Sequence, residues 1–168
     1  METLEAIKKR VSTRKFLSKQ ITDEELKIIL DAGKQAPVAY SKYEDLILTV
    51  VQDEKILAEL DRLCDEFYGV DTTLFFNAPT LIFVSSRKVK NNQEYENVAC
   101  VMENMALAAT DINIGNVYLK TMTLHIEEQI LSKLLQLPDG FRAIATLAVG
   151  YPDGNIIPKE HEIKVNFL

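Results

Sequence analysis

The sequence contains few of the residues that build disulfide frameworks and metal centres. Two cysteines, Cys64 and Cys100, and two histidines, His125 and His161, are all that its 168 residues contain. The cysteines form no C-x-x-C pair and the histidines lie far apart, so the spacing predicts no zinc site. Both cysteines fall on apolar stripes of expected helices, which favours buried, reduced thiols in a reducing compartment.

Long apolar runs are also absent. No stretch approaches the ~18 residues of a membrane span. The N-terminal residues lack the apolar core of a secretory signal, and Glu2 and Glu5 argue against a transit peptide. A formal net charge of −6 would repel nucleic acid and anionic lipid surfaces. We therefore expect a cytoplasmic protein that binds neither nucleic acid nor membranes.

The chain is expected to form one domain over residues 1–168. Its hydrophobic content of 47% is enough for one core, and no internal repeat or long linker is visible. The elements alternate in the manner of an α/β protein. Strands are expected over residues 46–51, 78–84, 116–122 and 141–150. Helices are expected before residue 11, from Thr22 to about Ala36, after Asp53, over about 94–113, and over 125–136.

Local signals set the ends of these elements. Thr22 followed by Glu25 is a capping box, and Asp53 is a suitable cap for the next helix. The run LILTVV at 46–51 indicates a buried strand. The helix over 94–113 is apolar around much of its circumference, which predicts burial in the domain centre or in a subunit interface. Gly115 is expected to close this helix in a left-handed conformation.

The C-terminal residues are too polar to pack by themselves, yet they end in Val165, Phe167 and Leu168. We expect this tail to cross another surface, such as that of another subunit.

The stretch RVSTRKF, Arg10 to Phe16, stands out in an acidic chain. The region around it carries six cations and no acid: Lys8, Lys9, Arg10, Arg14, Lys15 and Lys19. One interpretation is a solvated face whose cations pair with surface acids. The other is a phosphate site, because Arg10, Ser12 and Arg14 would point to one side of an extended segment. No GxxxxGK[ST] loop or GxGxxG turn is present, so the spacing alone does not identify the anion.

Three parts of the chain together resemble the FMN-dependent nitroreductase family. RVSTRKF followed by ITDEELKIILDAGKQAP is similar to the family's N-terminal region. ENMALAATDINIGNVYL resembles its long core helix, and AVGYPDG followed by PKEH resembles its C-terminal strand and its lysine-bearing tail. The resemblance covers nearly the whole chain.

The resemblance implies an α+β fold of three layers, with a mostly antiparallel central sheet flanked by helices. It also implies a homodimer that holds FMN at the interface, with the tail 155–168 exchanged onto the partner. The implied FMN contacts are Arg10, Val11, Ser12, Arg14, Pro37, Val38, Ala39, Ser41, Thr121, Met122, Thr123, Lys159 and His161.

These residues divide by the part of FMN that the resemblance assigns to them. Arg10, Ser12, Arg14 and Lys159 would hold the ribityl phosphate, and His161 stands where the family commonly has arginine. The loop from Pro37 to Ser41 would approach from the partner chain, and the turn 121–123 would lie along the isoalloxazine ring. No side chain is expected to act as a catalytic acid or nucleophile.

The ring end departs further from the family pattern than the phosphate end. After Ala-Pro the family usually reads Ser-x-x-Asn-x-Gln-Pro-Trp, whereas this chain reads VAYSKYED at 38–45. Tyr40 and Tyr43 in this loop either stack on flavin or substrate or cover core edges. Met122 is either a flavin neighbour or a core residue.

The implied function is reduction of an electron-poor acceptor, such as a nitro compound or quinone, with NADH or NADPH as donor in a ping-pong reaction. The alternatives are a non-catalytic flavin-binding or sensing dimer, and a dimer that binds no flavin.

Overall fold

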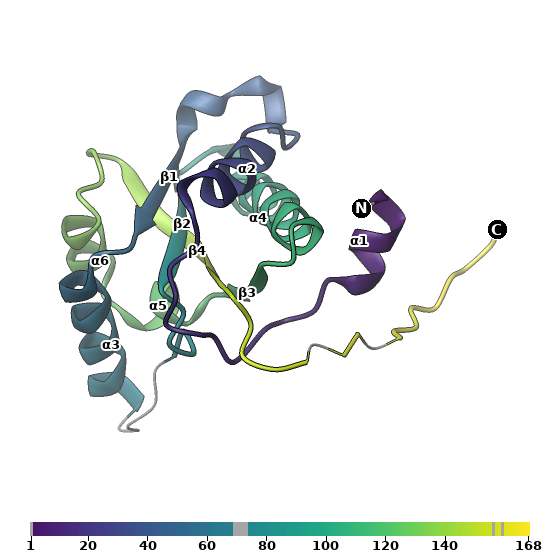
Figure 1. Cartoon of the computed structure of the whole chain (residues 1–168). Coiled ribbons are helices and arrows are strands. Elements are labelled where there is room, and N and C mark those ends of the chain that lie inside the picture. The colour runs from purple at the N-terminus through teal and green to yellow at the C-terminus, as the bar shows by residue number, and fades with distance from the viewer. Residues whose placement is uncertain (1, 69–73, 156, 159) are drawn as a thin grey trace.

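One antiparallel sheet forms the centre of the molecule. The computed structural model describes residues 2–68, 74–155, 157–158 and 160–168. Within them the strands are β1 (Leu46–Val51), β2 (Thr80–Arg87), β3 (Gly115–Leu119) and β4 (Phe141–Gly150). They lie in the order β1-β2-β4-β3, and every pairing is antiparallel (Figure 1). The predictions for β1 and β4 are confirmed in full, whereas β2 begins two residues later than expected and extends to Arg87.

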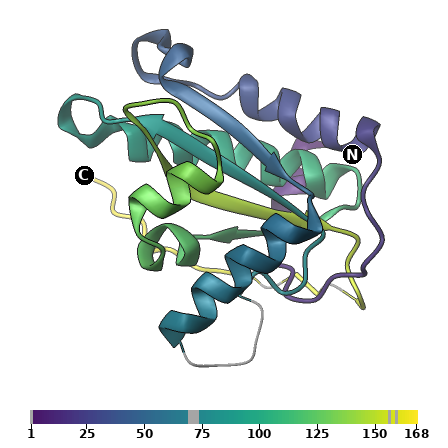
Figure 2. The same ribbon diagram turned by 90° about the vertical axis from the view of Figure 1, so that its left-hand side faces the viewer.

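Helices cover both faces of the sheet, which gives the expected three layers (Figure 2). Two long helices, α2 (Asp23–Lys34) and α4 (Gln93–Asp111), lie on one face, and α1 (Thr3–Lys9) contacts α4. The other face carries α3 (Glu54–Tyr68), α5 (Thr121–His125) and α6 (Glu128–Leu134). Three 3₁₀ turns lie in the connections, at Ala39–Ser41, Tyr43–Asp45 and Lys90–Asn92.

Strand β2 shows why the sheet is buried on both faces. Ile82 and Val84 pack with α2 and α4, while Leu81 and Phe83 pack with the helices of the other face. Side chains alternate along a strand, so a strand covered on both faces is apolar at consecutive positions. The prediction that β1 is a buried strand is wrong for five of its six residues, which are half-buried, because β1 is an edge strand in the described part of the chain.

The N-termini of two helices form as the sequence predicts. Thr22 and Glu25 make the reciprocal capping box of α2, with the Glu25 amide donating to Thr22 Oγ1 at 3.2 Å. Asp53 Oδ1 accepts hydrogen bonds from the amides of Lys55 and Ile56 at the start of α3. These caps satisfy N–H groups that have no partner within the helix.

Helix α4 is buried on the face toward α2 and the sheet rather than around its whole circumference. Val98, Met102 and Met105 are fully buried, while Ala99 and Glu103 on the opposite side are exposed. Gly33 of α2 allows the two helices to approach closely, because a Cβ there would lie 2.7 Å from Met105 Cγ. In one chain, the expected burial on several sides is therefore incomplete.

The end of α4 corrects a second prediction. Gly115 is not the left-handed cap, since it begins β3, and the left-handed residue is Asn113 with φ 60°. Asparagine tolerates this conformation better than most residues. Glycine is required at 115 for space, because a Cβ there would lie 2.9 Å from the Thr13 side chain.

The region after β3 also differs from the prediction. The strand ends at Leu119 instead of 122, and α5 begins at Thr121. The expected helix over 125–136 is the shorter α6. A bulge in β4 contributes, since Ser85 pairs with Ala143 and Val84 with Ala145, leaving Ile144 between them. The Ile144 carbonyl accepts from Lys120 Nζ at 2.5 Å and Thr123 Oγ1 at 3.1 Å, which holds the chain in its turn toward α5.

A buried ion pair fixes the start of α4 to the sheet. Glu94 has no exposed surface, accepts from Arg142 at 3.0 Å and accepts from the Val89 amide at 3.3 Å. Burial alone would raise the pKa of Glu94, but backbone hydrogen bonds and the Arg142 guanidinium outweigh it and leave the pKa lowered. Glu94 therefore stays ionised when folded and connects α4, the 88–92 loop and β4.

Asn155 and Pro158 of the tail still line a cavity with the basic segment, and the C-terminal end of the chain extends away from the sheet and its helices (Figure 1). Its apolar side chains Ile163, Val165 and Phe167 are 86%, 70% and 90% exposed. None of the helices in the described part of the chain has the length and apolar character that crossing a bilayer requires.

Replacement of Glu94 by glutamine tests the buried ion pair. Because a charged hydrogen-bond partner of Arg142 is lost, Glu94→Gln should lower the free energy of unfolding by about 2 kcal/mol at pH 7. A carboxylate with a lowered folded pKa stabilises above its unfolded pKa and loses that effect in acid. The deficit should therefore shrink as the pH falls below 4.5, the ordinary pKa of glutamate.

Urea titrations at several pH values measure the deficit in the free energy of unfolding, with Glu96→Gln, an exposed site on the same helix, as control. A deficit independent of pH would contradict the account.

Candidate functional site

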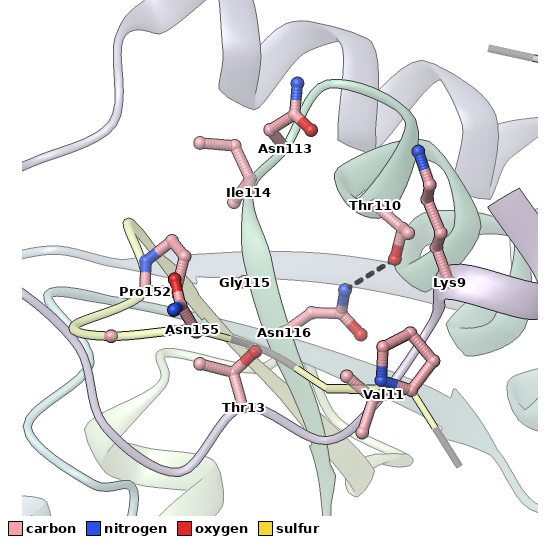
Figure 3. Close-up of a pocket in the computed structure, with 12 residues that line it drawn as sticks. Lys9, Val11, Thr13, Thr110, Asn113, Ile114, Gly115, Asn116, Pro152 and Asn155 are labelled. Carbon is pink, nitrogen blue, oxygen red and sulfur yellow. Dashed lines mark hydrogen bonds between the residues drawn. The ribbon is translucent and has the colours of Figure 1, made fainter.

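The basic segment 10–16 lies in an extended conformation beside the edge of the sheet (Figure 3). The Thr13 amide donates to the Asn116 carbonyl of β3 at 2.8 Å, so Ser12 and Asn116 form a parallel bridge. Beyond it, the Leu17 amide donates to the Tyr151 carbonyl at 2.9 Å, just past the end of β4. The segment is therefore tied to the sheet at two points, which fixes the direction of its side chains.

Side chains of the segment point alternately to two sides. Val11 and Thr13 line a cavity of about 350 Å³ against β3, which Figure 3 shows. Arg10 instead lines a separate cavity of about 670 Å³, and Arg14 is exposed. Ser12 is half-buried between them. The cavity linings separate Val11 and Thr13 from Arg10, whereas a common side for Arg10, Ser12 and Arg14 stays a prediction.

Two lysines in the basic region form close ion pairs, whereas the two arginines do not. Lys9 pairs with Glu5 at 2.6 Å, and Lys15 pairs with Asp153 at 2.6 Å. Arg10 has only a long contact of 3.8 Å with Glu103, and Arg14 has no ion pair within the part of the chain that the structure describes. The solvated-face interpretation thus describes Lys9 and Lys15, while Arg14 remains available to an anion and Arg10 is only loosely paired.

The tail brings one more expected residue to Arg10. His161 and Arg10 line the same cavity, together with Lys8 and Glu160. Lys159, the other tail residue that the sequence points to, lies outside the described residues. The side chains that line this cavity therefore come from both ends of the chain.

Thr13 lies at the site although it is not among the residues that the sequence predicts to contact a ligand. Its side chain is 5% exposed, and its Oγ1 has no hydrogen-bond partner among the described residues. Nearby, Asn116 Nδ2 donates to Thr110 Oγ1 at 3.1 Å and to the Ala106 carbonyl at 3.1 Å, which joins β3 to the end of α4 (Figure 3). The period-two pattern alone would have placed Thr13 on this inner side.

The loop with Pro37, Val38, Ala39 and Ser41 lies at the other end of the sheet from the basic segment (Figure 1). The Ala39 amide donates to Asn97 Oδ1 at 2.9 Å, which anchors the loop to α4. Tyr43 donates its hydroxyl to the Ala36 carbonyl at 3.1 Å, so it covers a core edge. Tyr40 is 82% exposed. One chain therefore does not bring this loop to Arg10 or Arg14.

The residues expected to form a turn, Thr121 to Thr123, instead begin helix α5. Met122 is fully buried in the core on the α3 side of the sheet, which favours the core interpretation for its side chain. The Thr123 hydroxyl donates to the Ile144 carbonyl. Backbone N–H groups at the first turn of a helix have no acceptor within that helix. Only the backbone of this segment and the half-buried Thr121 are thus placed to meet a ligand.

Lys120, which precedes α5, was not predicted to lie near a site. Its ammonium lies 5.5 Å from the centre of the Tyr95 ring. Burial lowers the pKa of Lys120, and Arg142 acts in the same direction, while Tyr95 opposes them. A half-buried cation thus lies directly beside the segment 121–123.

Comparisons with known proteins agree with this geometry. The model of the nitroreductase family matches residues 7–70 and 66–151. An NADPH-dependent oxidoreductase of Staphylococcus haemolyticus is 28% identical over 171 residues, covering 91% of this chain and 66% of that protein. The chain thus spans slightly less than two thirds of that relative's length.

Solved structures resemble the whole chain. A Bacteroides fragilis nitroreductase with bound FMN has a TM-score of 0.85 and 29% identity, covering 100% of this chain and 97% of the other. An FMN-dependent nitroreductase from Clostridium difficile has a TM-score of 0.84 and 25% identity, covering 99% of each chain. With the family model matched across most of its length and the same fold throughout, this chain belongs to the nitroreductase family.

Proposed function

We propose that the protein is a cytoplasmic, FMN-dependent oxidoreductase that takes electrons from NADH or NADPH and reduces an electron-poor small molecule, such as a nitro compound or a quinone. The observation that carries the proposal is that Arg10 and Arg14 flank Ser12 on an extended segment tied to the sheet, and that Arg14 has no ion pair within the described part of the chain. An acidic chain leaves these two cations largely without acids, while Lys9 and Lys15 are paired. FMN in the structure of the B. fragilis relative supplies the anion that such a site would hold.

The donor set fits a phosphate group. Guanidinium groups offer planar donors that match phosphate oxygens, and Ser12 adds a hydroxyl between the two arginines. Lys159 and His161 of the tail complete the proposed phosphate end, and His161 already shares a cavity with Arg10. Val11 would contribute backbone and apolar contact beside them.

The ring end of the proposed site comes from two other segments. Pro37, Val38, Ala39 and Ser41 would reach the ring from a partner chain, because they lie at the far end of the sheet from the basic segment of their own chain. Thr121, Met122 and Thr123 would present the backbone of the first turn of α5. The half-buried cation of Lys120 adds positive charge at this end.

When bound, FMN supplies hydride and electron transfer, receiving electrons from the nicotinamide donor and giving them to the acceptor in a second, separate half-reaction. The protein holds the phosphate with Arg10, Ser12 and Arg14, orients the ring between two chains and excludes water from it. None of its side chains needs to act as an acid or a nucleophile.

We further propose that the functional unit is a homodimer of single-domain chains, each spanning residues 1–168 and crossing its partner with the tail 155–168. Ile163, Val165 and Phe167 alternate along the tail and are almost fully exposed in one chain. Leu4 and Ile7 of α1 are 72% and 49% exposed. These apolar side chains would be buried by a second copy.

The visible spectrum of the purified protein tests the proposed activity. The full chain should bind FMN and show flavin absorbance, and anaerobic NADH or NADPH should bleach it, with colour returning when a quinone or nitro compound is added. Protein that binds flavin but is not bleached by either donor would favour the non-catalytic flavin-binding alternative. Protein that never binds flavin would exclude both.

Arg14→Ala tests the phosphate end. Loss of one charge-assisted contact to a partly buried phosphate typically costs ~2–5 kcal/mol, so the FMN affinity should fall on the order of 30-fold or more. Lys159→Ala should have a smaller effect, because one flexible ammonium donates less well than a planar guanidinium. Lys15→Ala is the matched control, since Lys15 is paired with Asp153. Equal FMN affinity in Arg14→Ala and Lys15→Ala, measured by fluorescence quenching, would disprove this assignment.

Light scattering tests the dimer. At low micromolar concentration the full chain should have twice the mass of one chain. Replacement of both Val165 and Phe167 by serine should weaken the dimer and, because the ring end needs two chains, weaken FMN binding as well. A stable wild-type monomer that binds FMN would contradict the shared site.

A further inference from the structure

A second cavity, of about 570 Å³, lies at the end of the sheet away from the basic segment. One wall is the loop 39–45, which leads into β1, and the other is the segment 88–97, which follows β2. Leu46 pairs with Ser86, so the two walls meet at the same end of neighbouring strands, as Figure 2 also shows. We call this the lysine cavity, after Lys42, Lys88 and Lys90, which line it.

Its charge is opposite to that of the chain as a whole. The three lysines come from both walls, all are exposed, and none forms an ion pair with any residue that the structure describes. Asp45 is the acid among the lining residues, and Arg87 lies 3.9 Å from it. In a protein of net charge −6, three unneutralised cations around one opening form a local positive field.

A buried amide adds a directional donor. Asn97 lines the cavity and is only 7% exposed. Its Oδ1 accepts from the Ala39 amide, whereas its Nδ2 makes no hydrogen bond to the described part of the chain. This Nδ2 group is not sealed from solvent, so it can donate to water or to a ligand in the cavity. Asn97 is therefore suited to meet an acceptor atom in the cavity.

The two walls are held in defined conformations. Tyr40 and Ser41 have φ values of 56° and 55°, and Asn91 and Asn92 have φ values of 63° and 59°. For the tyrosine this left-handed conformation is uncommon, and such residues persist where the surrounding structure holds them. The buried pair Glu94–Arg142 and the Glu94 contact to the Val89 amide hold the second wall. The Tyr40 ring stays exposed at the cavity and offers a flat surface.

We propose that the lysine cavity binds the anionic group, carboxylate or phosphate, of a planar small-molecule substrate, with the charge on Lys42, Lys88 and Lys90 and the planar part against Tyr40. This inference rests on the proposed function and deepens it, because it assigns a negative charge to a substrate of the oxidoreductase. Two substrates carry such a group: a carboxylate-bearing acceptor, and a nicotinamide donor with a 2′-phosphate.

The test compares a variant with one lysine removed from each wall, Lys42→Gln with Lys88→Gln, to a control with the same change in charge, Lys55→Gln with Lys133→Gln. The control lysines lie on α3 and α6, away from the cavity. Calorimetry on the full chain measures binding of two probes, 4-nitrobenzoate and 2′,5′-ADP. One exposed lysine–anion contact changes affinity by about 2- to 5-fold, so the double variant should bind a recognised probe about tenfold more weakly than the control.

Steady-state kinetics separate the two sources of the anion. If the acceptor carries it, KM for 4-nitrobenzoate rises about tenfold in the cavity variant while KM for neutral 4-nitrobenzyl alcohol does not change. If the donor carries it, KM for NADPH rises and KM for NADH does not. Either result supports the site. Equal binding of both probes by the cavity variant and the control overturns it, as does an equal rise in KM for charged and neutral substrates.

The binding measurement keeps this inference distinct from the proposed function. A chain that binds either probe through Lys42 and Lys88 but never takes up flavin would retain the anion site and lose the oxidoreductase assignment. A chain that takes up flavin and turns over, but binds the probes equally well without these lysines, would retain the oxidoreductase assignment and lose the anion site.

Discussion

The hydrogen bond from the Thr13 amide to the Asn116 carbonyl fixes the part of the molecule on which the proposed chemistry depends. It docks a segment without regular secondary structure onto the edge strand β3. Docking at Thr13 places the Thr13 side chain inward against Gly115, while Arg10 lines a separate cavity and Arg14 is exposed. The contact from Leu17 to Tyr151 holds the far end of the segment. A flexible peptide with the same residues would lose conformational entropy on binding an anion, and this docked segment loses less.

The two ends of the sheet have different roles in this account. The basic segment and the tail gather at one end, and the loop 37–45 with the segment 88–97 forms the other. The central strands β2 and β4 are buried on both faces, so the distance between the ends is set by a rigid element. A flavin held by both sets of residues requires a second chain. The exposed apolar tail and the proposed site therefore both depend on formation of the dimer.

Local chemistry made much of the fold predictable. The runs at 46–51 and 141–150 match β1 and β4 in full, because long β-branched and apolar runs between turns have few other stable conformations. The Thr22–Glu25 capping box is also confirmed. The predictions are wrong where contacts between residues distant in sequence decide the local structure. Gly115 was assigned to a cap because of its residue type, yet its small size serves packing against Thr13. β3 ends early where the Ile144 carbonyl, at a bulge in β4, accepts a hydrogen bond from Lys120. No local pattern in the sequence predicts such a bulge.

The same distinction applies to the site. Spacing alone placed Arg10, Ser12 and Arg14 on one side, and the family resemblance named their anion. Neither indicated that Lys15 would be paired while Arg14 would not, because the partner of Lys15, Asp153, is distant in sequence. Lys42, Lys88 and Lys90 also come together only through the pairing of β1 with β2.

The ratio of the affinities for FMN and riboflavin tests the central claim most directly, because the two molecules differ only in the phosphate. If the arginine segment holds that phosphate, riboflavin should bind at least about 30-fold more weakly than FMN to the unmodified protein at moderate salt, and added salt should reduce the difference. Equal affinities for the two flavins would contradict the account.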